Sequence, residues 1–458
     1  MFSLCTLLRN WSRFGLNTAL GLISILAISP VRAEPVAVPD TPAGRVLAAW
    51  LDAFNSGDRA RIGAYQQEYD PTSSRPLDAT MAFRARTGGF DLVGIHKNEP
   101  LHIEFLLKER ASDTRAMGRF EVTHSDPPKL TASGFQAIPP GATFIGFEID
   151  AVDRERVIAG SIAKLKENYV FPETAKKMGQ ALRLHQKRGD YDAVTDGEKF
   201  ASLLRAHLQE VSHDKHLRMD FSAVRYPDNS AGLSPQQLAD NRRMLDRTNC
   251  GFERAELLAG NVGYVKFNMF ADPALCGETA IAAMNFLAHV DAIIFDLRDN
   301  GGGAPQMIAL ISTYLFDEPT HLNDIWTRKT GATQQYWTLP TVPGMRIAAA
   351  PAFVLTSPRT FSGAEEFSYN LKNLKRATIV GETTGGGAHP VRGERVDDRF
   401  VIGVPFARAI NPITKTNWEG TGVEPDVKVP AADALITAQR LAAERLAGAG
   451  PAPRAGTN

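Results

Sequence analysis

The sequence has no excess of either charge. Its 51 Lys and Arg residues equal its 51 Asp and Glu residues, and no block of like charge occurs along the chain. A nucleic-acid partner or an anionic membrane surface requires a basic patch, so neither partner is expected. No later apolar run reaches the roughly 20 residues that span a bilayer, so we expect no stable membrane insertion. The 458 residues, 43% of them hydrophobic, suffice for roughly three domains.

The first 33 residues have the organisation of a secretory signal peptide. Arg9 and Arg13 precede an apolar segment at 15–28, and small residues lead up to Ala33. We therefore expect cleavage after Ala33 and a periplasmic or extracellular mature protein. The apolar segment is too short for a transmembrane anchor.

Cysteine is scarce, with three residues in the chain. Cys5 would leave with the signal peptide, whereas Cys250 and Cys276 would remain. In an oxidising compartment these two could form one disulfide, but two separate buried thiols fit the sequence equally well.

The chain divides into segments with different patterns of apolar residues. Residues 38–149 begin with helical spacing and continue with strand-like alternation, ending in an expected strand at 144–149, which predicts a small α+β domain. Its opening helix, in the text AWLDAFNSGDRARI, resembles that of the cone-shaped nuclear-transport-factor-like fold. Residues 150–225 predict a helical bundle that ends in a strand, and 226–250 a polar connector.

Residues 251–446 alternate strands and helices, which predicts an α/β core. The 447–458 tail contains Pro and Gly and is expected to be disordered. Within the core, residues 353–390 predict a strand, a sharp turn at Ser362, a helix and another strand. A hydroxyl at such a turn lies beside a helix N-terminus that favours negative charge, so Ser362 is a candidate nucleophile. An ordinary N-cap role is the alternative.

A glycine-rich turn, Gly301-Gly302-Gly303, follows another buried strand and precedes a helix. Backbone N–H groups in such a turn can approach a substrate oxygen without obstruction by side chains. A phosphate site is the rival interpretation. Neither this turn nor residues 385–387 is followed by the Lys and Ser/Thr of a P-loop, so no nucleotide cofactor is expected.

A serine nucleophile needs a base and a group that orients the base. His213, His216 and His389 are candidate bases, and a lysine is the other possibility. Glu419, in a loop before the last strand, is a candidate orienting group. Spacing alone does not choose among these residues.

Three ordered motifs resemble the tail-specific, or C-terminal processing, serine proteases: AIIFDLRDNGGG at 292–303, TFSGAEEF at 360–367 and GVEPD at 422–426. The resemblance covers about residues 150–440. It implies an α/β fold, with a crotonase/Clp protease-like ββα core and a helical-bundle subdomain.

Two departures place the chain in one branch of that family. Gly387 stands where the bacterial processing enzymes carry a lysine, and the chain has no room for their PDZ module. Both departures favour the branch that resembles the tricorn protease core and the interphotoreceptor retinoid-binding protein repeats.

By that resemblance, Ser362 is the nucleophile, His216 the base and Glu419 the third member of the site. The oxyanion hole falls on Gly301 or Gly302 and on the N–H of Gly363. Lys215 stands where tricorn has a serine beside the histidine, so the fourth member is not matched.

The resemblance implies a serine-type peptidase that acts on a peptide or protein substrate through an acyl-enzyme, with no cofactor and no metal. The alternative is a non-catalytic protein that carries apolar ligands on the same fold, as the retinoid-binding relatives do.

Overall fold

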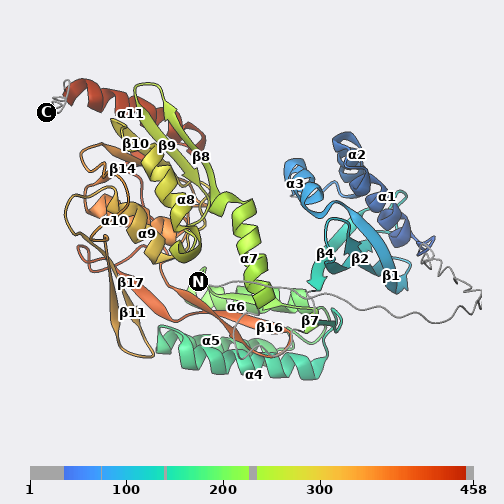
Figure 1. Cartoon of the computed structure of the whole chain (residues 1–458). Helices are drawn as coiled ribbons and strands as arrows, with labels where there is room; N and C mark the ends of the chain where they lie inside the picture. Colours follow the sequence, from blue (N-terminus) through green and yellow to red (C-terminus); the bar gives the residue numbers. More distant parts are fainter. Residues whose placement is uncertain (1–35, 74, 139–141, 226–234, 450–458) are drawn as a thin grey trace, which may run out of the picture. The chain divides into compact units, whose positions relative to one another are not determined.

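A computed structural model describes residues 36–73, 75–138, 142–225 and 235–449. The chain divides into two compact units, the first formed by residues up to 113 with 118–134, the second by 114–117 with 135–458 (Figure 1). The predicted signal peptide lies outside the described residues, as do positions 450–458 of the predicted tail. Among the described helices, none is long and apolar enough to cross a membrane.

The first unit places three helices before a four-stranded sheet of order β1-β2-β3-β4. Trp50 stacks on Phe54 and Phe90, which joins the first helix to the sheet through an aromatic core. The predicted order of helices and then strands is confirmed, and the likeness to the nuclear-transport-factor fold stays a prediction. The elements are α1 Pro42–Ser56, α2 Arg59–Tyr69, α3 Leu77–Thr87, β1 Phe90–Glu99, β2 His102–Glu109, β3 Arg115–Val122 and β4 Leu130–Ile138.

The strand predicted at 144–149 in that sheet is wrong. A short strand, β5 (Thr143–Phe144), pairs instead with β7 (Val224–Arg225) in the second unit. The alternating apolar pattern was therefore assigned to the wrong sheet, because periodicity does not identify a strand's partner.

The second unit begins with the predicted helical bundle, α4 (Ala151–Asn168), α5 (Pro172–Lys187) and α6 (Gly197–Ser212). The apolar faces of these helices pack on a sheet of order β15-β16-β6. Its strands are β15 Val391–Arg395, β16 Phe400–Pro405 and β6 Arg218–Phe221. Because β6 follows the bundle directly and pairs with β16, the end of α6 is fixed against the C-terminal part of the chain.

The α/β core is a six-stranded sheet of order β18-β14-β13-β10-β9-β8. Every neighbouring pair is parallel except β8 and β9, which are antiparallel. In chain order the strands are β8 Phe252–Leu258, β9 Val262–Phe267, β10 Ala292–Asp296, β13 Ala352–Thr356, β14 Ala377–Gly381 and β18 Val427–Lys428. The predicted alternation of strands and helices is confirmed.

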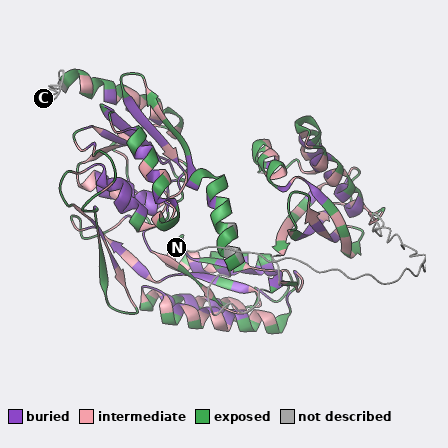
Figure 2. Ribbon diagram, in the orientation of Figure 1, coloured by how far each residue is buried: buried purple, intermediate pink, exposed green. Residues whose placement is uncertain are grey.

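Helices cover both faces of this sheet, so its central strands β9, β10 and β13 are buried on both sides, whereas the edge strand β8 is largely exposed (Figure 2). In β13, Val354 packs with helices α8 to α10, whereas Phe353 and Leu355 pack with α11. Because both faces of such parallel strands are buried, their sequences are continuous apolar runs instead of alternating patterns. The helices are α8 Pro273–Phe286, α9 Pro305–Thr313, α10 Gly363–Asn373 and α11 Ala434–Ala449.

The remaining elements complete the second unit. The predicted connector contains α7 (Pro235–Arg247), and a sheet of order β12-β11-β17 flanks the core. Its strands are β11 His321–Thr327, β12 Thr333–Trp337 and β17 Ala407–Ile410, and two short 3-10 helices are η1 Asn249–Gly251 and η2 Ala431–Asp433.

Cys250 and Cys276 form a disulfide, which decides between the two alternatives left open by the sequence. The bond joins η1 to α8, and both cysteines belong to the core on the α8 to α10 side of the sheet.

Candidate active site

Ser362 lies at the turn between β13 and α10, at the carboxyl end of a parallel strand. Its backbone has φ 55° and ψ −118°, and Ala364 N donates to Phe361 O across the turn at 3.0 Å. These angles are those of the first central position of a type II′ turn, which glycine normally occupies. A non-glycine residue held there costs about 1–3 kcal/mol, and such strain concentrates at functional sites.

His216 is the imidazole that faces this serine. Its Nε2 lies 3.2 Å from Ser362 Oγ, and its ring packs on Phe361 at 4.7 Å between centroids. The side chain is only 7% exposed. Burial lowers the pKa of His216 to about 4, because a buried site disfavours the charged imidazolium. The ring is therefore neutral near pH 7 and can accept the serine proton.

With His216 and Phe361 placed as they are, no side chain fits at position 387. A Cβ added to Gly387 would lie 2.6 Å from His216 Cε1 and would also overlap the Phe361 ring. The imidazole thus occupies the space into which a side chain at 387 would extend. The other candidate from the bundle, His213, is exposed at the C-cap of α6 and forms no hydrogen bond with Ser362.

Glu365 joins the serine turn to the loop beside His216. One of its carboxylate oxygens accepts N–H bonds from Ser362 at 2.7 Å and Gly387 at 2.9 Å. The other accepts from Gly386 N at 2.6 Å and Thr384 Oγ1 at 2.5 Å. This glutamate is absent from the site that the sequence predicts, although a carboxylate at the third position of a helix is a capping signal.

Glu419 does not reach His216. Its Oε2 lies 3.4 Å from His389 Nδ1 and accepts Ala388 N at 2.5 Å, whereas its Oε1 is buried without a hydrogen bond. Burial raises the pKa of Glu419 to about 7, and the charge of Asp214 adds to this rise. Of the triad predicted from the sequence, Ser362 and His216 are thus in contact, whereas Glu419 contacts His389 instead of His216.

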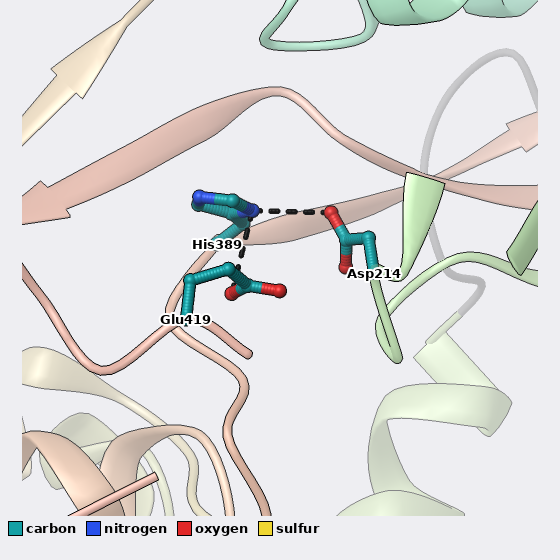
Figure 3. Close-up of side chains that lie close together, drawn as sticks. All are labelled: Asp214, His389 and Glu419. Atoms are coloured by element: carbon teal, nitrogen blue, oxygen red, sulfur yellow. Dashed lines mark hydrogen bonds and ion pairs between the residues drawn. The ribbon is translucent and has the colours of Figure 1, made fainter. Parts of the chain in front are cut away.

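One nitrogen of His389 faces two carboxylates (Figure 3). Its Nδ1 is 3.1 Å from Asp214 Oδ2 and 3.4 Å from Glu419 Oε2. Donor atoms of these three residues lie within 4.8 Å of one another, so the cluster could hold a metal ion. The same atoms already bond to each other, and Asp214 also accepts from Tyr169 Oη at 3.1 Å, so a hydrogen-bond network accounts for them without an ion.

The glycine turn after β10 lies against the serine turn. A Cβ added to Gly302 would be 2.5 Å from Gly363 N, and Phe361 N donates to Asn300 O at 3.0 Å. However, Gly301 N donates to Asn268 O, and Gly302 N donates to Asn300 Oδ1. The N–H groups of Gly301 and Gly302, predicted for the oxyanion hole, are therefore occupied, one by the segment after β9 and the other within the turn.

Two other N–H groups of these turns remain available. Within the described residues, neither Gly303 N nor Gly363 N donates a hydrogen bond to another group. The two glycines are close, since a Cβ added to Gly363 would lie 2.8 Å from Gly303 N. The predicted donor Gly363 is thus free, and Gly303 replaces its two neighbours as the available partner.

Two family models match the second unit. Residues 261–429 match peptidase family S41, and residues 153–249 match the N-terminal domain of peptidase S41 in eukaryotic IRBP. The chain belongs to peptidase family S41. The motifs that carried the resemblance to processing proteases all lie inside the first match.

A carboxyl-terminal-processing protease from Picosynechococcus is 28% identical to this S41 chain over 171 residues. The match covers 37% of this chain and 39% of that protein, so the chain spans well under half of its length. Among solved structures, the tricorn protease matches 77% of this chain and 41% of its own, with 14% identity and a TM-score of 0.41. The photosystem II D1 C-terminal processing protease matches 61% of this chain and 93% of its own, with 17% identity and a TM-score of 0.38.

Substituting Gly387 with alanine should disable the serine. The new methyl group would displace the His216 ring from Ser362, so we expect labelling by a fluorophosphonate to slow at least ~10²-fold, the lower range for loss of a general base. The measurement is the labelling rate of purified protein. Gly301→Ala is the matched control, because a Cβ there meets no atom within 4 Å. Equal labelling of the two variants would contradict the proposed crowding at 387.

Proposed function

We propose that this S41 chain is a serine-type peptidase that acts through an acyl-enzyme. The observation that supports this proposal is the 3.2 Å approach of His216 Nε2 to Ser362 Oγ, with Ser362 held in a strained turn. Nucleophile and base within hydrogen-bond reach are the arrangement that serine catalysis requires.

In the proposed mechanism, Ser362 Oγ attacks the substrate carbonyl while His216 Nε2 takes the hydroxyl proton. The tetrahedral intermediate collapses when His216 returns that proton to the leaving amine, and the acyl group stays on Ser362. Water then attacks the acyl-enzyme with His216 again as base, which releases the acid and restores the serine. The attack by Ser362 and the later attack by water each need a neutral imidazole, which the buried position of His216 favours; expulsion of the amine instead uses the imidazolium formed in the first attack.

The developing oxyanion would be stabilised by the N–H of Gly363 and, as second donor, that of Gly303. Gly363 opens α10, so its N–H also lies at the positive end of the helix dipole. Loss of one such donor typically costs ~10²- to 10³-fold in rate. The absence of a Cβ at both positions leaves the approach to these groups open.

The proposed substrate is a peptide or protein, and the proposed location is the periplasm or the extracellular space. The apolar segment before Ala33 supports export, and the Cys250–Cys276 disulfide supports an oxidising compartment, where such bonds persist. A carrier of apolar ligands is the alternative, but a carrier has no need of a strained serine beside a buried imidazole.

Covalent labelling tests the nucleophile. A fluorophosphonate probe should label the wild-type protein, and Ser362→Ala should abolish labelling because the attacking oxygen is gone. His216→Ala should slow it ~10²- to 10⁴-fold through loss of the general base. His213→Ala is the matched control, since that exposed ring makes no contact with Ser362, and it should label at the wild-type rate. A folded wild-type protein that resists the probe would rule out the proposed function.

The pH dependence tests the assignment of the base. His216 must be unprotonated to act, and burial lowers its pKa to about 4. The labelling rate should therefore be present above this pH and be lost as pH falls through about 4, rather than through the usual histidine range near ~6.5. Circular dichroism at each pH separates titration from acid unfolding. A midpoint near neutrality in folded protein would show that the base is a solvated group instead.

A further inference from the structure

The reaction requires a partner for His216 that the predicted triad does not supply. When His216 takes the serine proton, its ring becomes a buried cation. Its other nitrogen, Nδ1, is buried and has no hydrogen bond. A buried charge is unfavourable unless it is paired, so an anion near Nδ1 would determine how readily the proton is accepted.

Among the described carboxylates, Asp214 is the one that comes within 4.0 Å of a His216 ring nitrogen. Its Oδ1 lies 4.0 Å from Nδ1 and accepts the backbone N–H of His216 at 3.0 Å. The negative charge of Asp214 opposes the effect of burial and raises the pKa of His216, whereas Glu419 makes no comparable contribution. The sequence motif that supplies the base therefore also supplies a carboxylate two residues earlier.

Asp214 is itself held from three sides. Its side chain is 2% exposed, and its Oδ2 accepts from Tyr169 Oη at 3.1 Å and faces His389 Nδ1 at 3.1 Å (Figure 3). Its backbone N–H donates to Ser212 Oγ at 3.2 Å. Because Oδ2 is fully engaged, Oδ1 remains directed to His216. Glu419 faces the same nitrogen of His389 as Asp214 does, at 3.4 Å.

We propose that Asp214, rather than Glu419, is the carboxylate that pairs with protonated His216, and that His389 positions Asp214 between its own ring and that of the base. This inference rests on the proposed function, since it assigns a charge partner to the same serine site. Asp214 and His389 are positioning residues, because they act through His216 and touch no reacting atom. Apo distances in such sites are often long and shorten during reaction, so a 4.0 Å gap can close to a hydrogen bond when Nδ1 carries the charge.

Glu419 then has a different part in the site. Its Oε2 faces the His389 nitrogen that also faces Asp214, so the two carboxylates meet at one nitrogen of the ring. A neutral His389 has one proton at most on Nδ1 and would share it between the two acceptors. Burial raises the pKa of Glu419 to about 7, so this carboxyl can hold a proton beside His389 near neutral pH.

Isosteric substitutions compare the two carboxylates. Asp214→Asn keeps the shape and an oxygen for the His216 backbone N–H but removes the charge, and labelling by a fluorophosphonate should slow ~10²- to 10⁴-fold, the range for losing the acid behind a catalytic histidine. His389→Gln should slow it less, and Glu419→Gln, the matched control, should stay within ~10-fold of wild type. A Glu419→Gln loss equal to or larger than that of Asp214→Asn would overturn the proposal.

A spectroscopic readout separates pairing from a general loss of structure. In the phosphonylated protein His216 is protonated, and a proton NMR signal far downfield from Nδ1–H bonded to a carboxylate is expected. The signal should persist in Glu419→Gln and vanish in Asp214→Asn, and its retention in Asp214→Asn would overturn the proposal. If wild type resists the probe, the proposed function fails. The same NMR signal can then be compared among the three proteins at a pH below the pKa of His216, where the ring is protonated, and this comparison still decides the pairing.

A metal ion at the cluster is the competing occupant. Labelling rates of wild-type protein should be equal before and after dialysis against EDTA if Asp214, His389 and Glu419 form only a hydrogen-bond network. Loss of labelling in EDTA that Zn²⁺ restores would make the three residues a metal site and would overturn the proposal.

Discussion

The carboxylate of Glu365 fixes the geometry on which the rest of the site depends. It binds the N–H of Ser362 and of two residues in the loop that faces the imidazole, Gly386 and Gly387. The serine turn and this loop are therefore one unit, although about twenty residues of helix and strand separate them. A buried carboxylate without these donors would be very unfavourable, so burial and the four hydrogen bonds require each other. Burial also raises the pKa of Glu365.

The location of this unit follows from the sheet. Parallel strands β10 and β13 end at the same edge, so the Asn300 turn and the Ser362 turn meet there. The base comes from another subdomain, and the pairing of β6 with β16 holds His216 at that edge. Two charges of the first motif have a structural role, since Arg298 binds Asp296 and the carbonyl of Ala431 before α11.

The sequence was sufficient to predict the elements that depend on a local pattern of residues. The apolar runs predicted the parallel strands, and the break before Ser362 predicted the strand, turn and helix. It was insufficient where the path of the backbone decides, as for the available N–H groups. Gly301 N donates to Asn268 O after β9, and Gly302 N donates to Asn300 Oδ1 in its own turn. The sequence also did not predict the partner of Glu419, whose carboxylate contacts His389 instead of His216.

The central claim is that Ser362 and His216 form the reacting pair at the edge of the sheet. A crystal structure of the protein inactivated by a fluorophosphonate tests it most directly. The account predicts phosphorus bonded to Ser362 Oγ, the phosphonyl oxygen within hydrogen-bond distance of Gly363 N and Gly303 N, and His216 Nε2 beside the leaving-group position. An adduct on another residue, or one on Ser362 whose neighbouring imidazole is His389, would contradict the account.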